Sequence, residues 1–250
     1  MYKSVLLVGV LGITACAKLS NAETNTPRIV ANSLTPTALI GSLLTTSVLN
    51  STSAATMGPY KSARSMLSFA VGCALDWTQS VSFTVSGTTY TYAGLLGVAP
   101  GWTTSGLSAT EAGWVSACIL ARVNLTSAVV EISARGGNVG YDTDLYEVSD
   151  YQIEEGAFWG NAFVDLGSLA AYSCNGVDQA ADDTYGDLPL RECAEWDGVA
   201  SSNRSPCGLS YAGLCSTACS SSTAPYTGCS FQGGTAASAV VTSFLYGAPQ

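Results

Sequence analysis

Three glutamates, Glu147, Glu154 and Glu155, are the residues of this 250-residue chain best suited to catalysis. They lie in an acidic and aromatic stretch that also contains Tyr151 and Trp159. Glycoside hydrolases need two carboxylates, about 5–5.5 Å apart for retention or roughly 6.5–9.5 Å apart for inversion. The glutamates would supply such a pair, and the aromatic rings would bind sugars. The same residues also suit an acidic protein without activity, as surface charge and half-buried aromatics, and this simpler interpretation is favoured.

Five aspartates carry the hard oxygen ligands that Ca²⁺ prefers. Two occur as Asp-Thr-Asp and three follow in a later loop-like stretch: Asp142, Asp144, Asp182, Asp183 and Asp187. An EF-hand with Gly186 at its sixth position fails, because Ala181 and Tyr185 occupy ligand positions. An irregular Ca²⁺ site is therefore a weaker hypothesis, and no other cofactor is expected.

The composition excludes several classes of function. The chain contains no histidine, which excludes a Ser-His-Asp triad and the H-E-x-x-H metalloproteases. The formal net charge is −9, and 14 of the 18 acidic residues lie between residues 142 and 197, where Arg191 is the one basic residue. Such a negative field repels nucleic acid. We therefore expect no nucleic-acid partner.

The N-terminus has the layout of a secretory signal. One lysine precedes an apolar core over residues 5–13, which is too short to span a bilayer. The sequence Ile13-Thr14-Ala15-Cys16 resembles the bacterial lipobox, in which the cysteine receives a diacylglyceryl group and becomes the first mature residue. The resemblance implies a lipid anchor on Cys16 and export to the outer membrane or cell surface. An ordinary secretory signal cut at Ala15 or Ala17 is the alternative.

The remaining cysteines are even in number. Removing Cys16 from the nine leaves eight, and an even count in an exported chain predicts disulfides, here four. Zinc is disfavoured, because the chain lacks histidine and an oxidising compartment disfavours thiolate sites. The eight are Cys73, Cys118, Cys174, Cys193, Cys207, Cys215, Cys219 and Cys229.

The spacing of apolar residues predicts a helix over about residues 36–48, weakened by Gly41 and several threonines, and two further helices. One covers about residues 60–77, with Cys73 and Trp77 on its buried face. The other starts at a capping box formed by Ser108 and Glu111 and continues to about residue 124. Because each of these two further helices carries an inward cysteine, we expect a bridge between Cys73 and Cys118.

Alternating residues predict strands. Residues 81–85 and 89–92 flank Ser86-Gly87 as a hairpin, and further strands are expected at 128–133, stopped by residues 135–138, and at 237–246. We expect an α+β fold, with a few helices packed on a small antiparallel sheet and a disulfide-rich, loop-rich C-terminal region. The chain divides into a signal peptide (1–15), a lipid-anchored flexible tether (16–35) and a single disulfide-stabilised domain (36–250), whose subregion 174–235 is cysteine-rich.

Residues 94–102, 114–122 and 155–161 resemble segments of uncharacterised exported lipoproteins of myxobacteria and relatives. The resemblance extends over roughly residues 65–245. It implies compartment and architecture, and no activity.

Together these patterns predict a lipid-anchored envelope or surface protein, structural or ligand-binding and non-catalytic. A polysaccharide hydrolase using two of the three glutamates is the alternative. Aromatic residues such as Trp102 and Trp159 are expected mostly in the core, and any that are exposed suit a glycan or an envelope protein partner.

Overall fold

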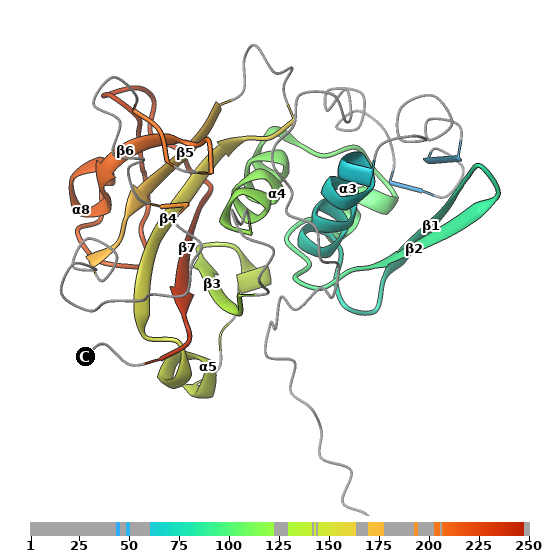
Figure 1. Ribbon diagram of the computed structural model, residues 1–250, viewed down its shortest axis with the longest axis horizontal. Coiled ribbons are helices and arrows are strands. Elements are labelled where there is room, and N and C mark those ends of the chain that lie inside the picture. Colours follow the sequence, from blue (N-terminus) through green and yellow to red (C-terminus); the bar gives the residue numbers. More distant parts are fainter. Residues whose placement is uncertain are drawn as a thin grey trace, which may run out of the picture.

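The computed structural model describes residues 44–45, 49–50, 61–122, 130–141, 143, 145–163, 170–177, 193–194, 203–205 and 207–247. Its elements, in chain order, are α3 (Lys61–Ala74), β1 (Ser80–Val85), β2 (Thr88–Ala93), η1 (Pro100–Thr103), α4 (Ala109–Ala121), β3 (Ile132–Gly136), η2 (Val139–Tyr141), α5 (Leu145–Asp150), β4 (Ile153–Asn161), β5 (Ala170–Asn175), β6 (Ser210–Leu214), α8 (Cys215–Ala218) and β7 (Val240–Leu245). The α+β prediction is confirmed (Figure 1). β1 and β2 form one sheet, and the other strands form a second in the order β3-β7-β4-β5-β6, in which β5 and β6 are parallel.

Strand β7 lies inside the larger sheet, between β3 and β4, and all six of its residues are buried. Val241 packs in the main core with residues of α4, whereas the neighbouring Val240 packs with Cys215 and Tyr226. Figure 1 shows α4 and the α8 segment on different sides of this sheet. The sequence places the strand correctly but suggests alternating exposure. Because successive side chains point to opposite faces and both faces are covered, burial is continuous instead.

Helix α4 begins at the predicted capping box. The Ser108 hydroxyl accepts a hydrogen bond from the Glu111 amide at 3.3 Å, and the Glu111 carboxylate accepts one from the Ser108 amide at 2.8 Å. Cys118 on this helix is bonded to Cys73 on α3, with Cα atoms 6.0 Å apart. The predicted bridge between the two helices is therefore present.

Helix α3 ends at Ala74, so the predicted extension to Trp77 is wrong. The backbone amides of Leu96, Val98 and Ala99 donate to the last carbonyls of the helix, at Gly72, Cys73 and Ala74. These carbonyls would otherwise lack partners at a helix end. The returning chain thus terminates the helix, and Trp77 is turned outward with 73% of its surface exposed.

The β1–β2 hairpin is confirmed. Val85 pairs with Thr88 around Ser86 and Gly87, which both have positive φ, at 49° and 81°. That conformation is typical of the two-residue turns that match the twist of a hairpin.

The boundary of β3 differs from the sequence prediction. The strand includes Arg135 and Gly136, the residues expected to stop it. The Arg135 guanidinium donates to the Tyr151 carbonyl at 2.6 Å and lies over the Phe244 ring at 3.8 Å, so this side chain is held against the sheet. The earlier part of the predicted strand, up to residue 129, lies outside the described residues.

Among the described residues four disulfides are present, as the even count predicts. Besides Cys73–Cys118 they are Cys174–Cys215, Cys193–Cys207 and Cys219–Cys229. Disulfides form and persist in oxidising compartments, and these bonds suggest a protein outside the reducing cytoplasm. Within the described ranges no helix is long and apolar enough to cross a membrane. The signal peptide, Cys16 and the tether lie outside those ranges.

Candidate functional site

The three candidate glutamates come from two neighbouring elements. Glu147 is a buried residue of α5, and Glu154 and Glu155 are consecutive residues of β4. The register of β4 against β7 shifts here, because Glu154 pairs with Phe244 and Gly156 pairs with Ser243. Glu155 is therefore the extra residue of a β-bulge, a feature that locally re-aims side chains.

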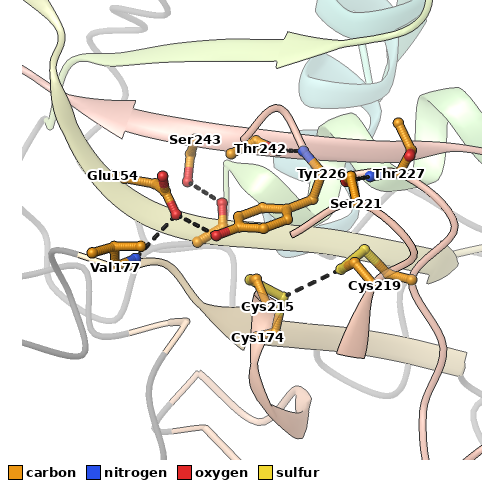
Figure 2. The surroundings of a disulfide bond; sticks show 12 residues. Glu154, Cys174, Val177, Cys215, Cys219, Ser221, Tyr226, Thr227, Thr242 and Ser243 are labelled. Atoms are coloured by element: carbon orange, nitrogen blue, oxygen red, sulfur yellow. Dashed lines mark hydrogen bonds between the residues drawn. A yellow bond between two sulfur atoms is a disulfide. The ribbon is translucent and has the colours of Figure 1, made fainter. Parts of the chain in front are cut away.

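Glu154 binds the loop that is closed by the Cys219–Cys229 disulfide. Its Oε1 accepts hydrogen bonds from the Tyr226 hydroxyl at 2.6 Å and from the Val177 amide at 3.0 Å. The Tyr226 amide in turn donates to Thr242 of β7 at 2.8 Å. Figure 2 shows Tyr226 attached to the sheet at both ends through these bonds. The carboxylate thus fastens the cysteine-rich segment onto the sheet.

Glu155 is fully buried and has a different partner. Its Oε2 accepts a hydrogen bond from the Ser243 hydroxyl at 2.5 Å. Ser243 and Thr242 are neighbours in β7, so their side chains point to opposite faces of the sheet. Glu155 binds Ser243, whereas Glu154 binds Tyr226, which is held by Thr242. The partners of the two glutamates therefore lie on opposite faces. Glu155 therefore stabilises the side that packs against α4.

Glu147 lies near Arg135. Burial lowers the pKa of the Arg135 guanidinium, and the charge of Glu147 opposes that change. Arg135 also donates to Ser133 at 3.0 Å, besides its contacts with Tyr151 and Phe244. The charge of Glu147 thus acts on a cation that is already held within the sheet.

The glutamates and aromatic residues considered for catalysis are held within the fold. Two of the glutamates are buried, and Glu154 and Glu155 bind partners on opposite faces. Trp159, expected as a sugar platform, is buried beside Tyr172 at a ring-centroid distance of 5.8 Å. Trp102 is buried as well. These aromatic residues are core residues, as the simpler interpretation predicts for most of them.

Tyr226 is the partner of Glu154, and no motif in the sequence indicates this role. Burial is the main cause that raises the pKa of its phenol, and the hydrogen bond to Glu154 and the charge of that carboxylate raise it further. The hydroxyl therefore stays protonated and donates to the carboxylate well into the alkaline range. The two residues are 72 positions apart in sequence, so no local pattern could have paired them.

The five aspartates proposed as Ca²⁺ ligands, Asp142, Asp144, Asp182, Asp183 and Asp187, lie outside the described residues. Among the residues that the structure does describe, no three acidic or cysteine side chains are grouped so that they could hold a metal ion.

A separate surface at α5 is apolar and exposed. Leu145, Tyr146 and Val148 are exposed by 87%, 79% and 41%. Tyr246, exposed by 65%, lies at the same end of the sheet, because its ring contacts Tyr151 at 5.7 Å and the next residue, Gly247, exchanges backbone hydrogen bonds with Asp150 and Gln152. We call Leu145, Tyr146, Val148 and Tyr246 the α5 patch. Clustered exposed apolar side chains of this kind mark interaction sites.

Replacing Tyr226 with phenylalanine tests the structural role of Glu154. Tyr226→Phe removes a hydrogen bond to a charged group, so the free energy of unfolding should fall by about 1–3 kcal/mol in a urea titration. Because the folded-state pKa of Tyr226 is raised, the contribution is complete below the unfolded pKa of about 10 and is lost as the pH rises further.

The matched control is Tyr246→Phe, which removes a hydroxyl from an exposed tyrosine and should change the unfolding free energy by less than about 0.5 kcal/mol. Equal effects of the two substitutions would contradict the role assigned to the bond between Tyr226 and Glu154.

The chain was compared with protein-family models, with curated proteins and with solved structures, and none of the three comparisons gives a match. The features of this chain that bear on its function are the glutamates in structural hydrogen bonds, the cysteine-rich segment that Tyr226 fastens to the sheet, and the exposed α5 patch.

Proposed function

We propose that the protein is a lipid-anchored component of the bacterial envelope that acts by binding another envelope protein, without catalysis, through the α5 patch. The proposal rests on the contrast between the candidate glutamates and the α5 patch. The carboxylates that suit catalysis are buried or hydrogen-bonded within the fold, whereas apolar side chains that suit binding face solvent. Exposing Leu145 and Tyr146 on one short helix is unfavourable unless another surface covers them.

The chemistry of the α5 patch favours a protein partner. Leu145 and Val148 are aliphatic and offer sugars no hydrogen bonds, whereas an apolar protein surface would remove them from water. Tyr146 and Tyr246 each combine an apolar ring with a hydroxyl, a combination enriched in protein interfaces. The exposed Asp150 and the acidic sequence around the helix favour a basic rim on the partner.

Attachment to the membrane rests on the N-terminal sequence. The four disulfides support an exported body. Ile13-Thr14-Ala15-Cys16 supports lipidation, since a modified Cys16 accounts for the ninth cysteine. An anchor of two or more acyl chains holds a protein stably, because each buried CH₂ contributes about 0.8 kcal/mol. The body would then be presented at the outer membrane or cell surface.

Crosslinking in intact cells tests the α5 patch. With the photo-crosslinking residue p-benzoylphenylalanine in place of Tyr146, irradiation should join the protein to one envelope protein, seen as a discrete heavier band and identified by mass spectrometry. The same residue in place of Trp77, which is comparably exposed but lies beside β1, is the control and should give no such band. Identical bands from both positions, or none from Tyr146, would show that the patch is not the contact surface.

The lipid anchor is tested by Cys16→Ser. The wild-type mature chain should carry the mass of its acyl groups and partition into the membrane fraction, and the variant should lose both properties because serine offers no thiol for the diacylglyceryl group. Ala17→Ser, one residue away, leaves the cysteine in place and should behave as the wild type. A Cys16→Ser protein that keeps its acyl mass and its membrane partition would refute the anchor.

A further inference from the structure

Two disulfides touch each other on one face of the larger sheet. Cys174–Cys215 joins β5 to α8, and Cys219–Cys229 closes the loop that contains Tyr226. The sulfurs of Cys174 and Cys219 are 4.0 Å apart, although they belong to different disulfides (Figure 2). Both are oxidised and carry no hydrogen, so this is a van der Waals contact between two electrophilic sulfurs.

Helix α8 brings the two disulfides together. Cys215 and Cys219 are four residues apart, and the Cys219 amide donates to the Cys215 carbonyl at 3.0 Å, so the two side chains lie on one face of a helical turn. Cys174 is bonded to Cys215 and is in contact with Cys219. Either cysteine of the turn is therefore placed to bond with Cys174.

The four cysteines differ in their access to solvent. Cys174, Cys215 and Cys229 are fully buried, and Cys219 is partly exposed. A thiol in solution can therefore enter the cluster at Cys219. The next sulfur that a Cys219 thiolate meets is the one on Cys174.

We propose that Cys174, Cys215, Cys219 and Cys229 form a site of thiol–disulfide exchange whose substrate is an external dithiol. A thiolate of the dithiol attacks Cys219, the Cys219–Cys229 bond breaks, and the electron pair leaves on Cys229. The dithiol and Cys219 are now joined by a mixed disulfide, which the second thiolate of the dithiol breaks. The dithiol departs as a disulfide and Cys219 is left as a thiolate.

The second stage stays inside the protein. The Cys219 thiolate attacks Cys174, the Cys174–Cys219 bond forms, the Cys174–Cys215 bond breaks, and its electron pair leaves on Cys215. In total one dithiol is oxidised and one disulfide of the protein is reduced. The two protons lost by the dithiol are taken up by Cys215 and Cys229, which end as thiols.

The exchange changes how the loop around Tyr226 is held. Before it, the loop is closed covalently by Cys219–Cys229. Afterwards Cys229 is a thiol, and the part of the loop that leads to it is held only by noncovalent contacts. Among these are the hydrogen bonds of Tyr226 to Thr242 and Glu154. The activity is separate from the binding proposed for the α5 patch, and either can fail without the other.

Partial reduction of the mature wild-type protein tests the exchange. The protein is treated with limiting dithiothreitol, quenched with acid, alkylated, and mapped by mass spectrometry after pepsin digestion at low pH, where exchange stops. The proposal predicts a species that contains a Cys174–Cys219 disulfide and carries the alkyl label on Cys215 and Cys229. A singly reduced population in which Cys174–Cys215 is always intact, with label on Cys219 and Cys229 together, would overturn it.

A variant isolates the internal stage. Cys229→Ser leaves Cys219 without its partner, so at pH near the thiol pKa of about 8.5 the label should divide between Cys219 and Cys215. The control Cys118→Ser leaves Cys73 unpaired, and because the Cys73 sulfur contacts Arg122 at 3.9 Å rather than another disulfide, the label should stay on Cys73. Label on Cys219 alone in Cys229→Ser would overturn the internal stage. The wild-type map decides the matter if that variant does not fold.

Discussion

The burial of β7 on both faces is the constraint on which the rest of the structure depends. This strand comes last in the chain, yet it lies between β3 and β4 and has no exposed residue. Such a strand is stable only if each face has its own cover. The larger cover is helix α4, with α3 packed behind it, and the smaller is the segment around α8 and Tyr226. Disulfides fix both, since Cys73–Cys118 joins the two helices and Cys174–Cys215 joins α8 to the sheet.

The acidic residues of β4 form hydrogen bonds on the two covered faces of the sheet. A buried carboxylate is costly unless it is hydrogen-bonded, and each of the two consecutive glutamates has a hydroxyl donor. Glu154 accepts from Tyr226, on the side of the cysteine-rich segment, and Glu155 accepts from Ser243 of β7. The β-bulge between Glu154 and Gly156 allows the side chains of Glu154 and Glu155 to reach these two different partners.

Those parts of the fold that depend on local chemistry could be predicted from the sequence. The hairpin turn at Ser86-Gly87 and the capping box at Ser108 and Glu111 are encoded within a few residues, and both are present. The bridge between Cys73 and Cys118 followed from helical spacing. The end of α3 could not be predicted, because it is set by amides of a chain that returns some twenty residues later, around Leu96.

The candidate site was predicted less well, because its residue types were recognisable and their partners were not. Glu154 and Glu155 stand side by side in the sequence, and nothing local shows that one binds Tyr226 and the other Ser243. The contact between Cys174 and Cys219 likewise depends on how α8 packs against β5. The exposure of Leu145 and Tyr146 beside the buried Glu147 was likewise not evident from the acidic and aromatic sequence around them.

We propose that the glutamates of β4 stabilise the fold and take no part in catalysis. The decisive comparison is between Glu154→Ala and Asp150→Ala, an equal loss of charge at an exposed position, in urea unfolding and in release of reducing sugars from envelope polysaccharide. We predict that Glu154→Ala lowers the free energy of unfolding by about 1–3 kcal/mol, that Asp150→Ala changes it by less than about 0.5 kcal/mol, and that neither variant nor the wild type releases sugar. Sugar release by the wild type that is lost in a Glu154→Ala protein of unchanged stability would contradict the account.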